Sequence, residues 1–168
     1  SLPDETSYMP AARLAELTGG DVGNLKPVLE WLDESRPFAI RDSFDHRLLL
    51  SQRLLLEDGE RVELLSAAGG TLAQNADPDT RFVADLADGQ VKEALSDLSP
   101  LRALLPVASG TLRSGRLALT DDEGKTRARA LLRELEPAGG NAVLLLTVQG
   151  VRGYDKALRD LVARIGDC

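Results

Sequence analysis

Apolar residues in the first part of the chain recur at helical spacing. The stretch PAARLAEL at 10–17 consists of good helix formers and stops at the glycine pair 19–20, which predicts a first helix. A second helix is predicted over 25–34, where Asn24 can cap the start and Pro27 fits the first turn. Its apolar face would be formed by Leu25, Val28, Leu29 and Leu32.

After Pro37 the pattern changes to apolar runs that are typical of strands. Asp58-Gly59 is a hairpin turn signal, and Gly69-Gly70 marks a second turn. The pattern at 72–79 is ambiguous. Strands are predicted at 38–41, 47–56, 61–66 and 81–86.

The second half of the chain begins with helical spacing and then returns to strands. Asp88 is predicted to cap a helix over 89–98, and Pro100 to start a short helical turn that ends at Leu105. An acidic turn at 121–124 separates two of the later strands. Those strands are predicted at about 109–119, 125–135 and 142–149, and a last helix follows with Tyr154, Leu158, Leu161, Val162 and Ile165 on one face.

This order of elements predicts an antiparallel meander with a few helices, which is the α+β class. Strands with one polar and one apolar face fit a barrel covered by peripheral helices. A length of 168 residues predicts a single domain over 1–168.

Composition and charge exclude several classes of function. The net charge of -7 argues against nucleic acid as a partner, because binding a phosphate backbone needs a broad basic surface. No apolar run is long enough to span a membrane, and the start of the sequence lacks the features of a signal peptide. The single cysteine, Cys168, excludes a disulfide framework. A cytoplasmic protein with no membrane partner is expected.

The stretch GKTRARALLREL at 124–135 concentrates positive charge within this acidic chain. Lys125, Arg127, Arg129 and Arg133 alternate with small or apolar residues, so on a strand they would share one face. That face is either an ordinary solvated face or the lining of an anion site. A P-loop is rejected, because position 119 is leucine where the motif needs glycine and the preceding turn is acidic.

Three segments, taken in order, resemble the CYTH domain, the triphosphate tunnel family, in the variant associated with helical CHAD domains. The first is RDSFDHRL at 41–48. The second runs from LRALLPV at 101–107 through Arg113 and Arg116 to DEGKT at 122–126. The third is VRGYDKA at 151–157.

The resemblance implies a closed barrel of about eight antiparallel strands whose basic lumen, or tunnel, holds a triphosphate, with Mg²⁺ or Mn²⁺ assisting hydrolysis. It also implies a CHAD-domain partner. The anion-binding residues would be Lys125, Arg127, Arg129, Arg116, Arg152 and Arg53. Arg152 has a structural alternative as a cap partner of the last helix. Asp42 would hold either a metal or an arginine.

The sequence departs from the family where carboxylates are needed. No Glu-x-Glu-x-Lys segment is present, and the late strand at 142–146 reads AVLLL with no acidic residue. No metal ligand is therefore assigned, and the catalytic residues stay unknown. The expected function is binding of triphosphate, polyphosphate or another phosphorylated anion with little or no hydrolysis. Two alternatives are an active metal-dependent inorganic triphosphatase and a structural module with no anion binding.

Overall fold

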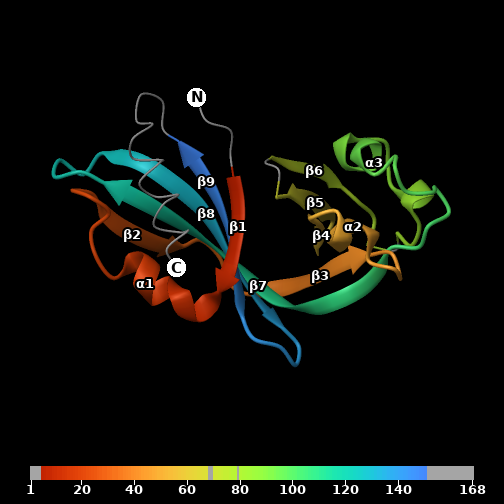
Figure 1. Cartoon of the computed structure of the whole chain (residues 1–168), viewed down its shortest axis with the longest axis horizontal. Helices are drawn as coiled ribbons and strands as arrows, with labels where there is room; N and C mark the ends of the chain where they lie inside the picture. The colour runs from red at the N-terminus through yellow and green to blue at the C-terminus, as the bar shows by residue number, and fades with distance from the viewer. Residues whose placement is uncertain (1–4, 68–69, 79, 151–168) are drawn as a thin grey trace. The chain divides into compact units, whose positions relative to one another are not determined.

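The computed structural model describes residues 5–67, 70–78 and 80–150 (Figure 1). These residues form strands β1 to β9 and a few short helices, and the chain divides into two compact units. The terminal unit contains residues 1–35 and 112–168, and the central unit contains residues 36–111. Strand β7 (Leu105–Thr120) contributes its first part to the central unit and its remainder to the terminal unit.

The terminal unit is built on an antiparallel sheet in which β1, β9, β8 and β7 follow one another, and β2 also pairs with β7. A short 3-10 helix (Ala11–Arg13) and α1 (Leu14–Thr18) connect β1 to the segment before β2, and together they overlap the helix predicted at 10–17. The other strands of this unit are β1 (Glu5–Pro10), β2 (Lys26–Trp31), β8 (Thr126–Pro137) and β9 (Val143–Gly150).

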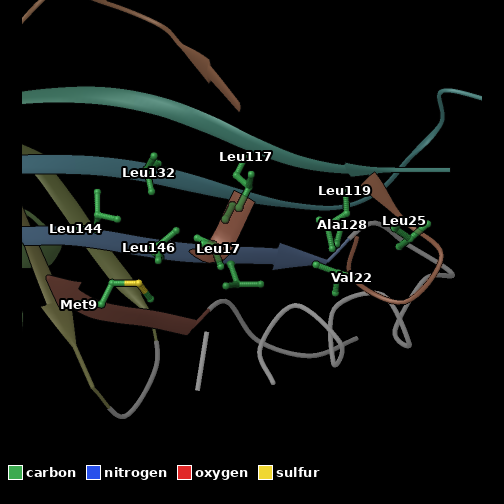
Figure 2. Close-up of a cluster of buried hydrophobic side chains, with 12 residues drawn as sticks. Met9, Leu17, Val22, Leu25, Leu117, Leu119, Ala128, Leu132, Leu144 and Leu146 are labelled. Atoms are coloured by element: carbon green, nitrogen blue, oxygen red, sulfur yellow. The ribbon is translucent and has the colours of Figure 1, made fainter. Parts of the chain in front are cut away.

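One face of this sheet packs against α1 and forms the terminal core (Figure 2). Leu17 of α1 is completely buried, as are Leu132, Leu144 and Leu146 of β8 and β9. Alternate residues of each strand point to this core, which follows from the two-residue period of side chains along a strand. The opposite face of the sheet is therefore the one on which polar side chains of β7 and β8 lie.

The helix predicted at 25–34 is wrong, because this segment forms strand β2. Its exposure alternates residue by residue: Val28 and Glu30 are exposed, whereas Leu29 and Trp31 pack against the terminal core. Leu29 and Trp31 thus fit a two-residue period that leaves Val28 on the exposed side, and pairing with β7 decides in favour of the strand. Pro27 fits because β2 lies at the edge of the sheet, where a missing backbone donor is tolerated.

The central unit pairs the first part of β7 with β3, and β4, β5 and β6 follow in order. It has a core of its own, in which Leu48, Leu55, Val91 and Leu95 are completely buried. Its elements are β3 (Arg36–Asp42), α2 (Arg47–Leu50), β4 (Arg53–Asp58), β5 (Arg61–Ser66), β6 (Thr71–Asn75), a 3-10 helix (Val83–Asp85) and α3 (Gln90–Ala94).

Local predictions in this unit are partly confirmed. Strand β5 and the turn at Asp58-Gly59 lie where they are predicted, and Gly59 has the positive φ of 63° that such a turn favours. The strand predicted at 47–56 is instead helix α2, a turn and then β4. The strand predicted at 81–86 is a 3-10 helix preceded by a single bridge at Phe82. The helix predicted at 89–98 is shorter, and Leu105 begins β7 instead of ending a helical turn.

The α+β class with antiparallel strands is confirmed, but the predicted closed eight-stranded barrel is wrong. Among the described residues, the strand pairing of neither unit returns to its starting strand, as closure would require. The physical reason is that the strands surround two separate cores. Strand β7, at 16 residues, is long enough to serve both units.

Candidate anion-binding site

The basic row predicted on the strand after the acidic turn lies on β8, and the two faces of β8 differ as expected. Ala128, Ala130 and Leu132 are buried in the terminal core. Arg127 and Arg129 alternate with them and so lie on the opposite face, where Arg127 is half-buried and Arg129 is exposed. The predicted division of this strand into an apolar side and a basic side is confirmed for Arg127 and Arg129, whereas Arg133, predicted to share the basic side, is buried.

Arg116 of β7 and Lys26 of β2 lie on this same side of the sheet. Leu117 follows Arg116 and is buried in the core, so the side chain of Arg116 points away from it, and Arg116 is exposed. Lys26 is opposite Thr120 of β7 and is also exposed. We call this surface the cationic face; its residues are Lys26, Arg116, Arg127 and Arg129.

Arg113 lies on the other side of β7, as the odd spacing between Arg113 and Arg116 predicts. Its guanidinium carbon lies 3.6 Å from the centroid of the Trp31 ring, and its Nε donates to Glu134 at 3.2 Å. Gly115 is required here, because a Cβ atom at this position would lie 2.9 Å from Cε3 of Trp31. The glycine thus admits the indole ring against the strand.

The members of the cationic face differ in whether they already have an anionic partner. Arg127 pairs with Asp121, whose Oδ2 lies 2.6 Å from Nη2 of Arg127. The pKa of Asp121 is lowered, first by the backbone N–H of Lys125 and then by Arg127. Arg116 and Arg129 make no ion pair within the described part of the chain. Their guanidinium groups are therefore the ones available to an external anion.

Lys125 belongs to the turn that connects β7 to β8 and is exposed. Its backbone N–H donates to Oδ1 of Asp121 at 2.9 Å, and Gly124 has a positive φ of 80°. The acidic segment at 121–123 is thus a hairpin turn, in agreement with its interpretation from the sequence.

The two remaining predicted site residues are Arg53 and Arg152. Arg53 begins β4 in the central unit and forms a bidentate pair with Asp97, at 2.6 and 3.1 Å. That pair lowers the pKa of Asp97. Arg152 lies outside the described residues. The predicted residues that share one face of the terminal unit are therefore Arg116, Arg127 and Arg129. Lys125 lies in the adjoining turn.

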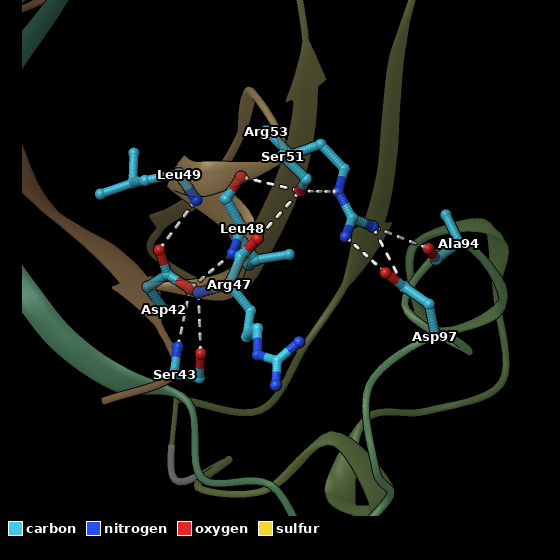
Figure 3. A network of polar contacts seen from close by, with 9 residues as sticks. All are labelled: Asp42, Ser43, Arg47, Leu48, Leu49, Ser51, Arg53, Ala94 and Asp97. Carbon is cyan, nitrogen blue, oxygen red and sulfur yellow. Dashed lines mark hydrogen bonds and ion pairs between the residues drawn. The ribbon is translucent and has the colours of Figure 1, made fainter. Parts of the chain in front are cut away.

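Asp42 is held by backbone groups, so neither prediction for it, a metal or an arginine, is confirmed (Figure 3). Its carboxylate is completely buried and accepts hydrogen bonds from the backbone N–H groups of Ser43, Leu48 and Leu49, at 2.8, 2.9 and 3.0 Å. The bonds to Leu48 and Leu49 satisfy amides of the first turn of α2, which have no partner inside the helix. The Arg-Asp-Ser segment that carries part of the family resemblance therefore has a structural role.

Lys26 is the member of the cationic face that the sequence analysis missed. It was assigned to the predicted helix at 25–34, where it would have had no relation to Arg116. The signal that identifies it is the alternation of polar and apolar residues from Lys26 to Trp31, which puts Lys26 and Glu30 on one side.

Metal-ligand clusters and membrane-spanning helices are both absent from the described residues. No three histidine, cysteine, aspartate or glutamate residues in this part of the chain are grouped so that they could hold a metal ion. None of the helices described here has the length and apolar character needed to cross a membrane.

Compared with models of known protein families and with curated proteins, the sequence matches none. The relation to the CYTH family therefore rests on the three segments quoted above and stays a prediction.

Proposed function

We propose that this chain binds inorganic triphosphate or polyphosphate on the cationic face of its terminal unit, with little or no hydrolysis. The observation that carries the proposal is the exposure of Arg116 and Arg129, which have no ion pair within the described residues of a chain with net charge -7. A guanidinium group offers several donors in a planar fork that suits phosphate oxygens.

The spacing of the cations suits an anion with several phosphate groups. Alternate residues of one strand, such as Arg127 and Arg129, lie roughly 6.7 Å apart, and neighbouring strands lie about 4.8 Å apart. Lys26 and Arg116 on β2 and β7 extend the positive charge across the sheet, and Glu30 is the acidic residue opposite Arg116. A chain of phosphates can therefore contact more of these cations at once than a single phosphate can.

The resemblance to the CYTH domain supports the same class of ligand, because that family binds triphosphate through arginines and lysines on strands. An open sheet changes how the ligand would be held, since the cations lie on a face and not in a closed lumen. The CHAD-domain partner implied by the resemblance stays a prediction.

Isothermal titration calorimetry with inorganic triphosphate, with and without Mn²⁺, tests the proposal. We expect binding that weakens as ionic strength rises, because exposed charges are screened. Each exposed arginine is expected to contribute about 1 kcal/mol, so the double variant Arg116→Gln, Arg129→Gln should bind roughly 30-fold more weakly.

The charge-matched control is Arg61→Gln, Arg81→Gln, which removes two exposed arginines of the central unit. Equal losses in the two double variants would contradict a specific site and leave only general charge attraction. No binding by the wild-type chain would favour a structural module. Release of phosphate that depends on Mn²⁺ would favour the active triphosphatase.

A further inference from the structure

The central unit contains a pocket that is separate from the cationic face. Its volume is about 330 Å³, within the range of small-ligand sites. The segment from 97 to 102 and Arg47 of α2 form its lining. The lining residues are Arg47, Asp97, Leu98, Ser99, Leu101 and Arg102.

One carboxylate holds the two arginines of this pocket in place. Oδ2 of Asp45 accepts from Nε of Arg47 and from Nη2 of Arg102, each at 3.0 Å. The hydroxyl of Ser43 donates to Oδ1 of Asp45 at 2.7 Å, which fixes the carboxylate itself. The guanidinium of Arg102 also lies over the ring of Phe44, 5.3 Å from its centroid. The two guanidinium groups are thus positioned before any ligand arrives.

These arginines keep donors that the described residues do not use. Arg47 donates through Nε alone, and its side chain is 60% exposed. Figure 3 shows its guanidinium directed away from the other side chains drawn there. Arg102 uses Nη2 for Asp45, and within the described part of the chain its other two guanidinium nitrogens make no hydrogen bond. A planar anion can therefore accept bonds from both residues.

The charge around the pocket sets the charge of the ligand. Arg53 and Asp97 neutralise each other through their bidentate pair. Arg47 and Arg102 share the single charge of Asp45, which leaves one net positive charge. One negative charge on a ligand balances it, whereas a phosphate dianion would leave an excess of negative charge near Asp45 and Asp97.

Apolar side chains lie beside the arginines. Leu98 is buried at the pocket wall, whereas Leu101 is 80% exposed and Phe44 is 71% exposed. A ligand with an apolar body would cover Leu101 and remove its apolar surface from water. We propose that this pocket binds a small organic monocarboxylate, whose carboxylate is held by Arg47 and Arg102 and whose apolar body lies against Leu98 and Leu101.

Titration of the full chain with 4-methylpentanoate, followed by calorimetry or by NMR shifts of backbone amides in the segment 97–102, tests this assignment. The dissociation constant is expected to be on the order of 1 mM, since the ligand has only about eight non-hydrogen atoms. Acetate, which lacks the apolar body, should bind at least about tenfold more weakly. The cationic analogue 4-methylpentylamine should not bind.

The decisive variant is Arg47→Gln, which removes a largely exposed side chain and should weaken binding about tenfold. Arg61→Gln, also in the central unit and similarly exposed, is the matched control and should leave the affinity unchanged. Circular dichroism and the unfolding midpoint confirm that both variants fold. Equal affinity of Arg47→Gln and wild type, or inorganic phosphate binding in the pocket as tightly as the carboxylate, would overturn the assignment.

The two proposals fail independently. Arg116→Gln, Arg129→Gln should retain 4-methylpentanoate binding, and Arg47→Gln should retain triphosphate binding. Loss of carboxylate binding in the first variant would mean that the ligand occupies the cationic face, which would overturn the pocket.

Discussion

Replacement of Asp42 is expected to destabilise the central unit strongly, although no ligand contacts this residue in our proposals. Its buried carboxylate accepts from three backbone N–H groups, at 2.8 to 3.0 Å. In Asp42→Ala all three lose their acceptor. Hydrogen bonds to a charged group are worth about 1.5–3 kcal/mol each, and loss of a helix cap alone costs about 0.5–2 kcal/mol. Because the three bonds share one group, we expect a total loss of about 4 kcal/mol in the free energy of unfolding.

Asp42→Asn provides an intermediate case. An amide oxygen in place of Oδ1 can still accept from Ser43 and Leu48, but the amide nitrogen cannot accept from Leu49. We therefore expect a loss of about 2 kcal/mol, smaller than that of the alanine variant. A protein of ordinary stability has about 5–15 kcal/mol in total, so both variants should still fold.

Urea unfolding followed by circular dichroism measures both losses, with Asp122→Asn as the control because Asp122 is exposed in the β7–β8 turn. Hydrogen exchange of the Leu49 amide should accelerate in both variants, whereas that of the Leu48 amide should accelerate in Asp42→Ala alone, because the asparagine oxygen still accepts from Leu48. A loss below about 1 kcal/mol for Asp42→Ala would refute the reasoning, because it would mean that water replaces the carboxylate at little cost.

Three further changes test other parts of the structure. Gly115→Ala should lower the free energy of unfolding by about 1–3 kcal/mol, because the new Cβ would lie 2.9 Å from the Trp31 ring; thermal unfolding measures this, and an unchanged midpoint would contradict it. Leu146→Ala, in the terminal core, should cost about 2–5 kcal/mol by urea unfolding, and a smaller loss would indicate that the core collapses around the cavity. The pKa of Asp45 is lowered to about 2, mainly by the Ser43 hydroxyl and, after some opposing desolvation, by Arg47. A carboxyl with a lowered pKa stabilises the fold above its unfolded pKa and loses this contribution as pH falls, so stability should decrease between about pH 4 and pH 2, and Asp45→Asn should show a smaller decrease over that range.

The strands of the terminal unit that could be predicted are those that their own run of polar and apolar residues identifies. The segments 109–119, 125–135 and 142–149 correspond to parts of β7, β8 and β9, and the acidic turn between the first two is short and glycine-containing. In β8 the alternation of alanine with arginine specifies both the strand and its buried side. Such features need no information from distant parts of the chain.

Strands that depend on distant partners were missed. β1 has six residues and pairs with β9, more than a hundred positions later in the chain. β2 carries apolar residues that satisfy a helical and an alternating pattern equally well, and its pairing with β7 settles the choice. The run at 47–56 contains eight leucine or arginine residues that suit either state. The helix begins at Arg47 because Ser43 Oγ accepts from the Arg47 amide and Asp42 accepts from the amides of Leu48 and Leu49.

The candidate sites show a similar limit, since the positive charge that an arginine offers to a ligand depends on its ion-pair partners. In the central unit, Arg36 donates to Asp58 at 2.7 Å and Arg41 to Glu57, and Arg53 is held by Asp97. None of these pairs is local in sequence, so counting arginines on predicted strands overestimates the positive charge that a ligand meets. Arg53 is an example, because its predicted role as an anion ligand takes no account of its pair with Asp97.

The ion-pair partners of the arginines also determine which kind of anion each of the two proposed sites can hold. On the cationic face, Arg116 and Arg129 have no ion pair among the described residues, so a ligand with several negative charges gains from each of them. In the pocket, Asp45 already balances one of the two charges of Arg47 and Arg102, and the remaining attraction suits a single negative charge. A carboxylate that orients two arginines thus lowers the affinity for polyanions while it fixes the geometry for one planar anion. Asp45→Asn should therefore shift the pocket toward phosphate, and competition between phosphate and 4-methylpentanoate in that variant measures the shift; an unchanged preference would show that Asp45 does not set the charge selectivity.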